Sequence, residues 1–333
     1  MKPLRLGIVG PGLIWSNTHR PILETLPDHF AISAFSATSE SSRRKVEREF
    51  PGAPFFTDYG DLVRSPDIDA VLVLTPIVLN APVAMAALRA GKHVFMEKPI
   101  ARSEEEGAEL LRIARESGGQ VFVLEQVGYR TWEPLQEIIR SGELGELVLY
   151  DRVSHSIFDA IDHTVRGYGT TGWRINPDFP LGTLFDGGHH HIATLSMLFG
   201  APKAVYASCF KARPEYGECD HVAMVLDYES GFRGLFSHSD YLGGGQNYFH
   251  IRGTDALVSV ESDALVVKSR EGEVLRTVEL AEENSHVNMW KAFARWVDDG
   301  TEPAYTLEHA FEDLRTLMAI DRSIDEESKV FLK

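Results

Sequence analysis

The sequence predicts an α/β fold, in which an N-terminal doubly wound parallel sheet precedes a C-terminal α/β domain with an open, mainly antiparallel sheet. In the first part of the chain, short apolar runs alternate with stretches of helical periodicity, as in parallel strands joined by crossover helices. Between residues 204 and 278, strand-like runs follow one another without helices, which indicates antiparallel pairing. A chain of 333 residues also exceeds what one core usually fills. We therefore expect two domains, residues 1–125 and 126–333.

Five apolar runs predict the strands of the first domain. They occupy residues 4–10, 30–35, 69–74, 93–96 and 120–124. Helix signals lie between them. The helical stretch 82–90 stops at Gly91, and the stretch 106–117 lies between a capping box of Ser103 and Glu106 and a terminal Gly118.

The second half of the chain has a different order of predicted helices and strands. A predicted helix at 132–142 and a strand precede a glycine-rich loop at 166–182 and a helix at 183–200. Hairpin signals such as Glu229-Ser230-Gly231 separate the strands that follow. Two helices, at 288–300 and 306–324, close the chain.

The composition excludes several classes of partner. A net charge of −16 repels nucleic acid phosphates and acidic membrane surfaces, so we expect neither as a partner. No apolar run reaches the roughly 18 residues of a membrane span. The N-terminus enters a strand pattern without the apolar stretch of a signal peptide, so we expect a cytoplasmic protein. Cys209 and Cys219 suit neither a disulfide framework nor a zinc site.

A glycine turn, Gly10-Pro11-Gly12, follows the first strand and precedes Leu13 and Ile14 of the next helix. Such a turn lets backbone N–H groups approach a pyrophosphate, with the helix N-terminus adding a favourable field. Trp15 stands where a G-x-G-x-x-G motif has its third glycine, which permits close packing of helix on strand. The turn therefore predicts a dinucleotide site, and a plain tight turn is the alternative.

The end of the second predicted strand bears on the choice of dinucleotide. An acid there would bind a free ribose 2′-hydroxyl, but the chain has Ser36, Ala37, Thr38 and Ser39. These hydroxyls, with Arg43 and Arg44 nearby, suit a 2′-phosphate. NADP is thus favoured over NAD, unless the arginines are solvated residues of the next helix.

The stretch LFDGGHHHI places a carboxylate near three histidines. On one continuous helix Asp186 and His190 share a face, His189 is the i+3 neighbour and His191 points away. A carboxylate beside an imidazole is a general acid/base arrangement, although spacing does not choose between His189 and His190. Consecutive helical side chains diverge and no HExxH or HxxEH pattern occurs, so we predict no metal site. A structural histidine cluster is the other interpretation.

Together the motifs resemble the Gfo/Idh/MocA family of sugar and polyol dehydrogenases. They are the glycine turn, TPIVLN at 75–80, GKHVFMEKP at 91–99, Trp173-Arg174 and the D-x-G-x-H at 186–190. The resemblance covers essentially the whole chain, and GKHVFMEKP at that position is its most specific part. It implies an N-terminal Rossmann domain and a C-terminal domain whose open sheet often makes oligomer contacts. We therefore expect a homo-oligomer, a dimer or a tetramer, formed through that sheet.

The resemblance also implies the catalytic residues. They are Lys98 of the EKP motif, Asp186 and His190, which makes the choice between the histidines. The chain departs from the family pattern at Trp15, at Asn80, where many members have His, and at Ala193, where many have Asp.

The expected activity is an NAD(P)-dependent hydride transfer between nicotinamide and a secondary alcohol of a sugar, polyol or related hydroxy compound. His190 would take the hydroxyl proton, Asp186 would orient it, Lys98 would stabilise charge on the oxygen and Glu97 would position the lysine or the cofactor. The expected cofactor contacts are Gly10, Gly12, Leu13, Ile14, Ser36, Thr38, Arg43, Thr75, Pro76, Asn80, Glu97 and Lys98. The expected substrate contacts are Lys98, Tyr168, Trp173, Arg174, Asn176 and His190, with His155, Asp159 and His163 as further candidates and core packing as the alternative role of Trp173.

Two other functions fit the same fold. One is an NAD-dependent glycosidase, which oxidises a sugar transiently, and the other is a non-catalytic protein that senses a dinucleotide or a sugar. The presence of Lys98, Asp186 and His190 argues against a sensor, which needs no proton relay. Other dehydrogenase classes fit less well, because no Tyr is followed four residues later by Lys and two cysteines cannot supply a medium-chain zinc site.

Overall fold

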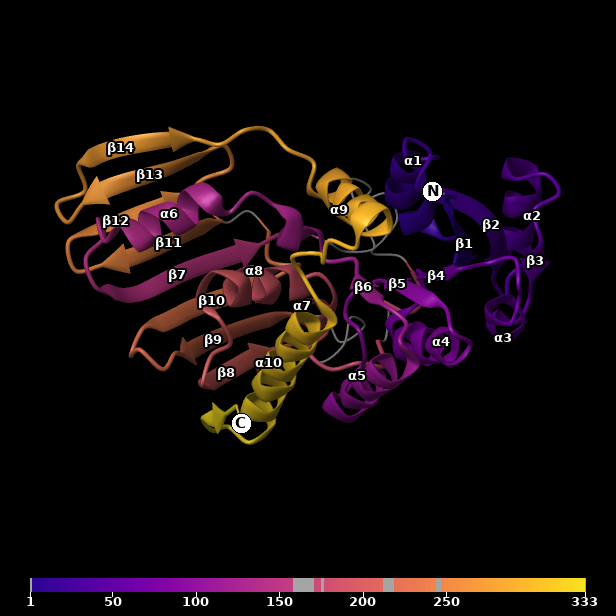
Figure 1. The fold of residues 1–333 in the computed structure, drawn as a ribbon. Coiled ribbons are helices and arrows are strands. Elements are labelled where there is room, and N and C mark those ends of the chain that lie inside the picture. The colour runs from indigo at the N-terminus through magenta and orange to yellow at the C-terminus, as the bar shows by residue number, and fades with distance from the viewer. Residues whose placement is uncertain (1, 158–170, 175–176, 212–218, 244–246, 333) are drawn as a thin grey trace. The chain divides into compact units, whose positions relative to one another are not determined.

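The computed structural model describes residues 2–157, 171–174, 177–211, 219–243 and 247–332 (Figure 1). The chain forms two compact units. The first comprises Met1–Arg130 and Asn284–Leu314, and the second Thr131–Glu283 and Arg315–Lys333. The first unit thus continues past the boundary near residue 125 that the sequence suggests and also takes in a late segment of the chain.

The first unit contains a six-stranded parallel sheet. Its strands are β1 (Leu4–Val9), β2 (Phe30–Ser36), β3 (Phe55–Phe56), β4 (Ala70–Val73), β5 (His93–Met96) and β6 (Val121–Val123). Their order is β3-β2-β1-β4-β5-β6, and every neighbouring pair is parallel. The order reverses between β1 and β4, as in a doubly wound dinucleotide-binding sheet, so the predicted fold class is confirmed.

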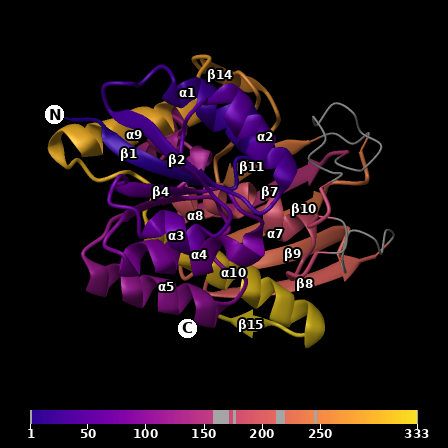
Figure 2. The same ribbon diagram turned by 90° about the vertical axis from the view of Figure 1, so that its right-hand side faces the viewer.

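Helices cover both faces of this sheet. They are η1 (Trp15–His19), α1 (Arg20–Leu23), α2 (Glu40–Glu49), α3 (Tyr59–Val63), α4 (Ile77–Arg89), α5 (Glu104–Ser117), η2 (Gln126–Tyr129) and α9 (Ser285–Asp299). Figure 2 shows α3, α4 and α5 on one side of the sheet and α1 and α9 on the other. The predicted caps of α5 are confirmed, since Ser103 accepts a hydrogen bond from the Glu106 N–H and Gly118 adopts a left-handed conformation.

Helix α9 joins the first unit because its apolar face completes that unit's core. Trp290 is fully buried, and its ring centroid lies 5.3 Å from that of Phe30 and 5.5 Å from that of Phe95. Phe293 packs against Phe122 at 5.3 Å. A row of aromatic side chains therefore connects a late helix to the centre of the sheet.

The second unit contains a nine-stranded sheet. Its strands are β7 (Leu147–His155), β8 (Ala204–Phe210), β9 (His221–Asp227), β10 (Arg233–Ser239), β11 (Tyr248–Gly253), β12 (Ala256–Val260), β13 (Ala264–Ser269), β14 (Val274–Glu279) and β15 (Val330–Phe331). Their order is β14-β13-β12-β11-β7-β10-β9-β8-β15. Apart from the parallel pair β7 and β10, the described neighbours are antiparallel, which confirms the predicted mainly antiparallel sheet.

Within the part of the second unit that the structure describes, the helices leave one face of its sheet open. They are α6 (Glu133–Ser141), α7 (Thr183–Asp186), α8 (His189–Phe199) and the later part of α10 (Leu307–Asp325). Helix α8 covers one face, where Phe199 stacks on Tyr150 of β7 at 5.2 Å. On the other face Tyr206, Phe210 and Leu235 remain 48%, 64% and 45% exposed. Among the described helices of the chain, none is long and apolar enough to cross a bilayer.

Candidate functional site

Strand register gathers three predicted site segments of the first unit at one edge of its sheet. Val9 of β1 pairs with Val73 of β4, and Val73 pairs with Met96 of β5. The glycine turn begins directly after β1, and Thr75 and Lys98 stand two residues after the ends of β4 and β5, respectively. They therefore lie at the carboxyl edge beside the point where strand order reverses, which is where ligands bind in doubly wound sheets.

The glycine turn is tight where the chain needs glycine and open above. Gly10 has a φ of 84°, and a Cβ there would lie 2.6 Å from the Leu74 carbonyl oxygen. At Gly12 the nearest atom to an added Cβ would be 3.9 Å away, so the backbone is accessible. Both features fit the close approach of a pyrophosphate, which a side chain at Gly12 would obstruct.

Trp15 lies beneath the turn and leaves the pyrophosphate position clear. Its side chain is 1% exposed and packs against Phe35 at 6.0 Å and Phe50 at 6.3 Å. The helical segment η1, which begins at Trp15, has π-helical hydrogen bonding. The side chain that replaces the third glycine of the motif is therefore buried in the core.

The segment after β2 provides hydroxyls and a lysine. Ser36 is buried, whereas Thr38 is exposed. Arg43 and Arg44 pair with Glu47 and Glu40 on the surface of α2, as solvated helix residues do. Lys45, which the sequence reasoning missed, hydrogen-bonds Ser16, whose hydroxyl also donates to the Gly12 carbonyl. Lys45 is therefore a cation that reaches the glycine-turn region through Ser16.

Asn80 shapes the EKP turn from inside the protein. Its amide nitrogen donates to the carbonyl oxygens of Glu97 at 3.2 Å and Pro99 at 3.0 Å, and its oxygen accepts from Thr75 at 2.8 Å. The side chain is fully buried. This burial does not fit the direct cofactor contact that we expected of Asn80. Lys98 lies in the sequence between Glu97 and Pro99, whose carbonyl oxygens accept from Asn80. It is half-buried and forms a cis peptide bond with Pro99.

His19 is a second residue that sequence reasoning missed. Its Nε2 lies 2.8 Å from Glu97 Oε1, and its Nδ1 accepts a hydrogen bond from the Trp290 indole at 3.1 Å. The imidazole is 1% exposed. The position of His19, four residues after the start of the helical segment that follows the glycine turn, gives only a weak signal of a role in the site. Its partners Glu97 and Trp290 lie far away in the sequence.

In the second unit, the predicted helix at 183–200 is two helices. Helix α7 ends at Asp186, and α8 begins at His189 after Gly187 and Gly188. A Cβ on Gly188 would lie 2.7 Å from three atoms of Leu184, so the junction requires glycine. The spacing argument for Asp186 and His190 assumed a continuous helix, which the structure corrects.

Asp186 pairs with Arg174, a partner that the spacing argument did not include. The Arg174 Nε donates to Asp186 Oδ2 at 2.6 Å, and both side chains are largely buried. The guanidinium lies 3.9 Å from the Trp173 ring centroid, and Phe179 contacts that ring from 6.2 Å. The carboxylate therefore anchors the loop that carries the predicted substrate contacts Trp173 and Arg174.

The three histidines of α8 differ in environment. His189 is fully buried, whereas His190 is half-exposed. His191 faces the sheet, with its ring nitrogens 2.6 Å from Arg152 and 2.7 Å from Ser154. Because His189 is buried and His191 is bonded to the sheet, His190 is the best candidate among the three for reaching a ligand.

Asp240 is a largely buried carboxylate near Asp186 that the sequence reasoning missed. Ser156 donates to its Oδ1 at 2.6 Å, and His238 Nε2 lies 3.5 Å from its Oδ2. A Cβ on Gly187 would be 3.3 Å from Oδ2, so the carboxylate lies against the α7–α8 junction. Burial by itself would raise the pKa of Asp240, but the interactions with His238 and Ser156 outweigh it and lower the pKa, against the opposing charge of Asp186.

The remaining predicted residues divide into two groups. Tyr168, Asn176, Asp159 and His163 lie outside the described residues. His155 hydrogen-bonds Ser237 at 2.9 Å, and the preceding residue, Ser154, bonds His191 of α8. Successive strand side chains point to opposite faces, so His155 lies on the open face, away from the helix that carries His190. This position does not fit the substrate contact that we expected of His155.

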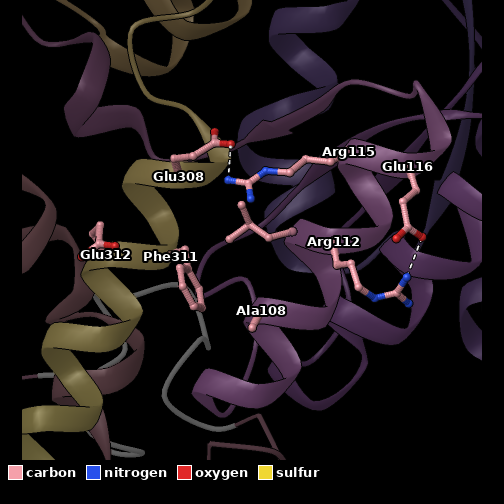
Figure 3. A pocket seen from close by; sticks show the side chains of 8 residues that line it. Ala108, Arg112, Arg115, Glu116, Glu308, Phe311 and Glu312 are labelled. Atoms are coloured by element: carbon pink, nitrogen blue, oxygen red, sulfur yellow. Dashed lines mark hydrogen bonds and ion pairs between the residues drawn. The ribbon is translucent and has the colours of Figure 1, made fainter. Parts of the chain in front are cut away.

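A pocket of about 460 Å³ lies in the first unit between α5 and the start of α10. Figure 3 shows the side chains that line it. Its lining residues are Ala108, Leu111, Arg112, Arg115, Glu116, Glu308, Phe311 and Glu312. Arg112 pairs with Glu116 and Arg115 with Glu308, so these basic groups have acidic partners. None of the predicted site residues lines this pocket, which makes it a poor candidate for the dinucleotide site.

Comparison with known families accounts for both halves of the chain. Residues 4–125 match a family model described as an oxidoreductase family with an NAD-binding Rossmann fold. Residues 132–259 match the GFO/IDH/MocA C-terminal domain. The chain belongs to the Gfo/Idh/MocA family. The resemblance drawn from the sequence motifs is thereby confirmed.

Two curated proteins illustrate the relationship. The chain is 34% identical over 229 residues to scyllo-inositol 2-dehydrogenase (NADP(+)) IolW of Bacillus subtilis, covering 68% of this chain and 60% of IolW. It is 30% identical over 241 residues to the trans-1,2-dihydrobenzene-1,2-diol dehydrogenase of Mus musculus, covering 71% of this chain and 68% of the mouse protein. The match to IolW thus spans less than two thirds of that relative.

A solved structure agrees over nearly the whole length. An oxidoreductase from Thermotoga maritima has a TM-score of 0.89 and 28% identity, with 99% of this chain and 98% of that chain covered. This Gfo/Idh/MocA protein therefore has the architecture of a known oxidoreductase structure.

Proposed function

We propose that this protein is an NAD(P)-dependent dehydrogenase or reductase that acts on a secondary alcohol of a sugar, polyol or related hydroxy compound. The observation that carries the proposal is the common edge at which the glycine turn, Thr75 and Lys98 follow β1, β4 and β5. Residues 1–125 would bind the dinucleotide, and residues 126–333 would bind the substrate and mediate self-association. The cytoplasmic location expected from the sequence belongs to the same proposal.

The names of the two relatives support a narrower substrate class. Scyllo-inositol and trans-1,2-dihydrobenzene-1,2-diol are both rings with adjacent hydroxyl groups. Because the names describe those proteins, we extend to this chain only the shared chemistry. A cyclic compound with neighbouring hydroxyls is therefore the first substrate class to test.

The described residues have the chemistry that alcohol oxidation requires. A bound nicotinamide would supply the hydride acceptor for the alcohol carbon, and the glycine turn, Thr75 and Lys98 are the residues that would hold it. His190, half-exposed on α8, takes the hydroxyl proton as a general base. Lys98 donates a hydrogen bond to the same oxygen, a contribution of about 2.7 to 4 kcal/mol if it matches one oxyanion donor. Asp186 holds Arg174 and the loop beside it, and so supports the substrate contacts proposed for Trp173 and Arg174.

NADP is the cofactor that we favour over NAD. The β2 end carries no acid to bind a free 2′-hydroxyl, and Thr38 offers an exposed hydroxyl there. Lys45 adds a positive charge next to Ser16, beyond the glycine turn. The name of IolW specifies NADP(+), in agreement with this preference.

A parallel titration with NADH and NADPH, followed by nicotinamide fluorescence and thermal shift, tests the proposal. We expect both to raise the melting temperature and NADPH to bind more tightly. Turnover is then measured with cyclic polyols and the oxidised dinucleotide that binds. Failure of both dinucleotides to bind would sink the dehydrogenase proposal, and glycoside cleavage without net change in the cofactor would identify the glycosidase instead.

An oligomer formed through the open sheet face is part of the proposal. Leu235 of β10 and Tyr206 of β8 both pair with Val225 of β9, so the three side chains form a row across three strands. Leu235 and Tyr206 are 45% and 48% exposed. An apolar row of this kind on a flat sheet suits contact with a second copy of the chain.

A further inference from the structure

A hydrogen-bond chain lies behind the EKP turn, and its two buried members, Trp290 and His19, have no role in the proposed chemistry. It runs from Trp290 of α9 to His19 of η1 and from His19 to Glu97 after β5. All three residues belong to the first compact unit. Since His19 is 1% exposed, the imidazole cannot meet a ligand itself. Its contribution to a bound ligand must pass through Glu97.

The direction of the chain follows from the chemistry of indole. Indole Nε1–H is a donor only, so His19 Nδ1 accepts the 3.1 Å hydrogen bond from Trp290. In the neutral imidazole the hydrogen then resides on Nε2, which donates to Glu97 Oε1 at 2.8 Å. Trp290 thereby selects the tautomer that can hold a carboxylate.

The donor at the start of the chain is itself held rigidly. The Trp290 ring is fully buried, with Phe30, Phe95 and Phe293 at centroid distances of 5.3, 5.5 and 5.4 Å. Such packing restricts the indole to one orientation. The imidazole therefore has a fixed support.

Residues from different segments hold the backbone and the side chain of Glu97. Asn80 donates to its backbone carbonyl, and His19 donates to its carboxylate. The Glu97 side chain is 16% exposed, so part of it still faces solvent. Because His19 lies in the helical segment that follows the glycine turn, the imidazole connects that segment to the lysine turn. The first of these segments follows the proposed pyrophosphate turn, and the second carries the lysine that is proposed to act at the reacting oxygen.

We propose that His19 is a positioning residue for dinucleotide binding, acting through the Glu97 carboxylate. The imidazole holds one carboxylate oxygen from inside the protein and so fixes the orientation in which Glu97 meets the bound dinucleotide beside Lys98. This inference rests on the proposed dehydrogenase function.

Two substitutions at His19 separate positioning from packing. In His19→Gln the side-chain amide extends to the position of Nε2 and can donate to Glu97. In His19→Asn the amide reaches only the position of Nδ1, so the contact with Glu97 is lost. We expect His19→Asn to weaken binding of the preferred dinucleotide by about tenfold or more, as loss of one hydrogen bond to a charged group does, and His19→Gln to stay within about threefold. Equal losses of affinity in both variants would mean a structural role and overturn the inference.

A double-mutant cycle gives a readout that packing does not change. If His19 acts through Glu97, the double variant His19→Asn/Glu97→Ala binds no more weakly than Glu97→Ala alone, because alanine removes the acceptor of the His19 hydrogen bond. Additive losses would overturn the inference. His93→Asn serves as the matched control, because His93 contacts Trp296 at 5.0 Å from the opposite, amino end of β5. We expect it to lower the melting temperature without changing dinucleotide affinity.

Dinucleotide binding by the wild-type protein distinguishes failure of the proposed function from failure of the inference about His19. If it binds neither NADH nor NADPH, the dehydrogenase proposal fails and this inference fails with it. If it binds a dinucleotide but the His19 variants behave alike or the cycle is additive, only the role of His19 is wrong. Fluorescence titration supplies the affinity and thermal shift the stability for every variant.

Discussion

At the scale of single residues, Gly10 and Gly12 of the same turn have different roles. Gly10 adopts a left-handed φ and lies against a carbonyl oxygen, whereas Gly12 has open space where a side chain would project. The first glycine serves the fold, and the second serves the proposed ligand. Sequence inspection finds both but cannot tell them apart, because the difference depends on the neighbouring strand.

Alanine at each glycine should separate these roles. We expect Gly10→Ala to lower the stability of the first unit by about 1 to 3 kcal/mol, since it adds a Cβ in a left-handed conformation against Leu74. Gly12→Ala should melt like the wild type but bind dinucleotide more weakly. Thermal melts and fluorescence titrations check both expectations, and unchanged affinity in Gly12→Ala would count against the pyrophosphate position.

His190 carries the sharpest prediction for catalysis. We expect His190→Ala to lower turnover near neutral pH by about 10² to 10⁴-fold, the usual contribution of a general base, with cofactor affinity largely retained. The neighbouring His191→Ala is the control, because His191 contacts Arg152 and Ser154 of the sheet. It should melt at a lower temperature and keep most of its turnover. Loss of cofactor binding in His190→Ala would show that the histidine has been misassigned.

At the scale of elements, the open face of the second sheet carries a histidine pair with a pH dependence. His155 and His221 both hydrogen-bond the Ser237 hydroxyl at 2.9 Å. Burial, followed by the charge of other histidines, lowers the pKa of each. Their neutral forms are therefore the ones that the folded state prefers, and protonation favours unfolding.

This preference predicts a loss of stability on mild acidification. The stability associated with the pair is fully present above the unfolded histidine pKa of about 6.5 and is lost as the pH falls through the lower folded values. We expect the melting temperature of the wild type to fall more between pH 7.5 and pH 5 than that of His155→Gln. Identical pH profiles for the two proteins would contradict the assignment.

Element boundaries were predictable where the signal is local. The caps of α5 at Ser103 and Gly118 follow from adjacent residues. The break between α7 and α8 does not, because helical periodicity continues through Gly187 and Gly188. Glycine is favoured there because a Cβ on Gly188 would approach Leu184 and a Cβ on Gly187 would approach Asp240.

At the scale of the whole molecule, self-association through the open sheet is the feature to test. We expect the wild type to sediment as a dimer or tetramer of its 37.1 kDa chain, and Leu235→Glu to shift it towards the monomer by placing a charge in the apolar row. Leu275→Glu, at an exposed position of the edge strand β14, is the control and should leave the mass unchanged. A monomeric wild type would contradict the proposed interface.

The sequence by itself determined the α/β class, the glycine turn, the EKP and D-x-G-x-H motifs and, through them, the family. These properties depend on residues close together in the chain. Only the tertiary structure decided that Trp15 packs inward, that Arg174 pairs with Asp186 and that α9 completes the first core. It likewise revealed the chain from Trp290 through His19 to Glu97, whose first step joins residues 271 positions apart. Such contacts join segments that are far apart in the sequence, and a local sequence pattern does not indicate which distant side chain will occupy a given position.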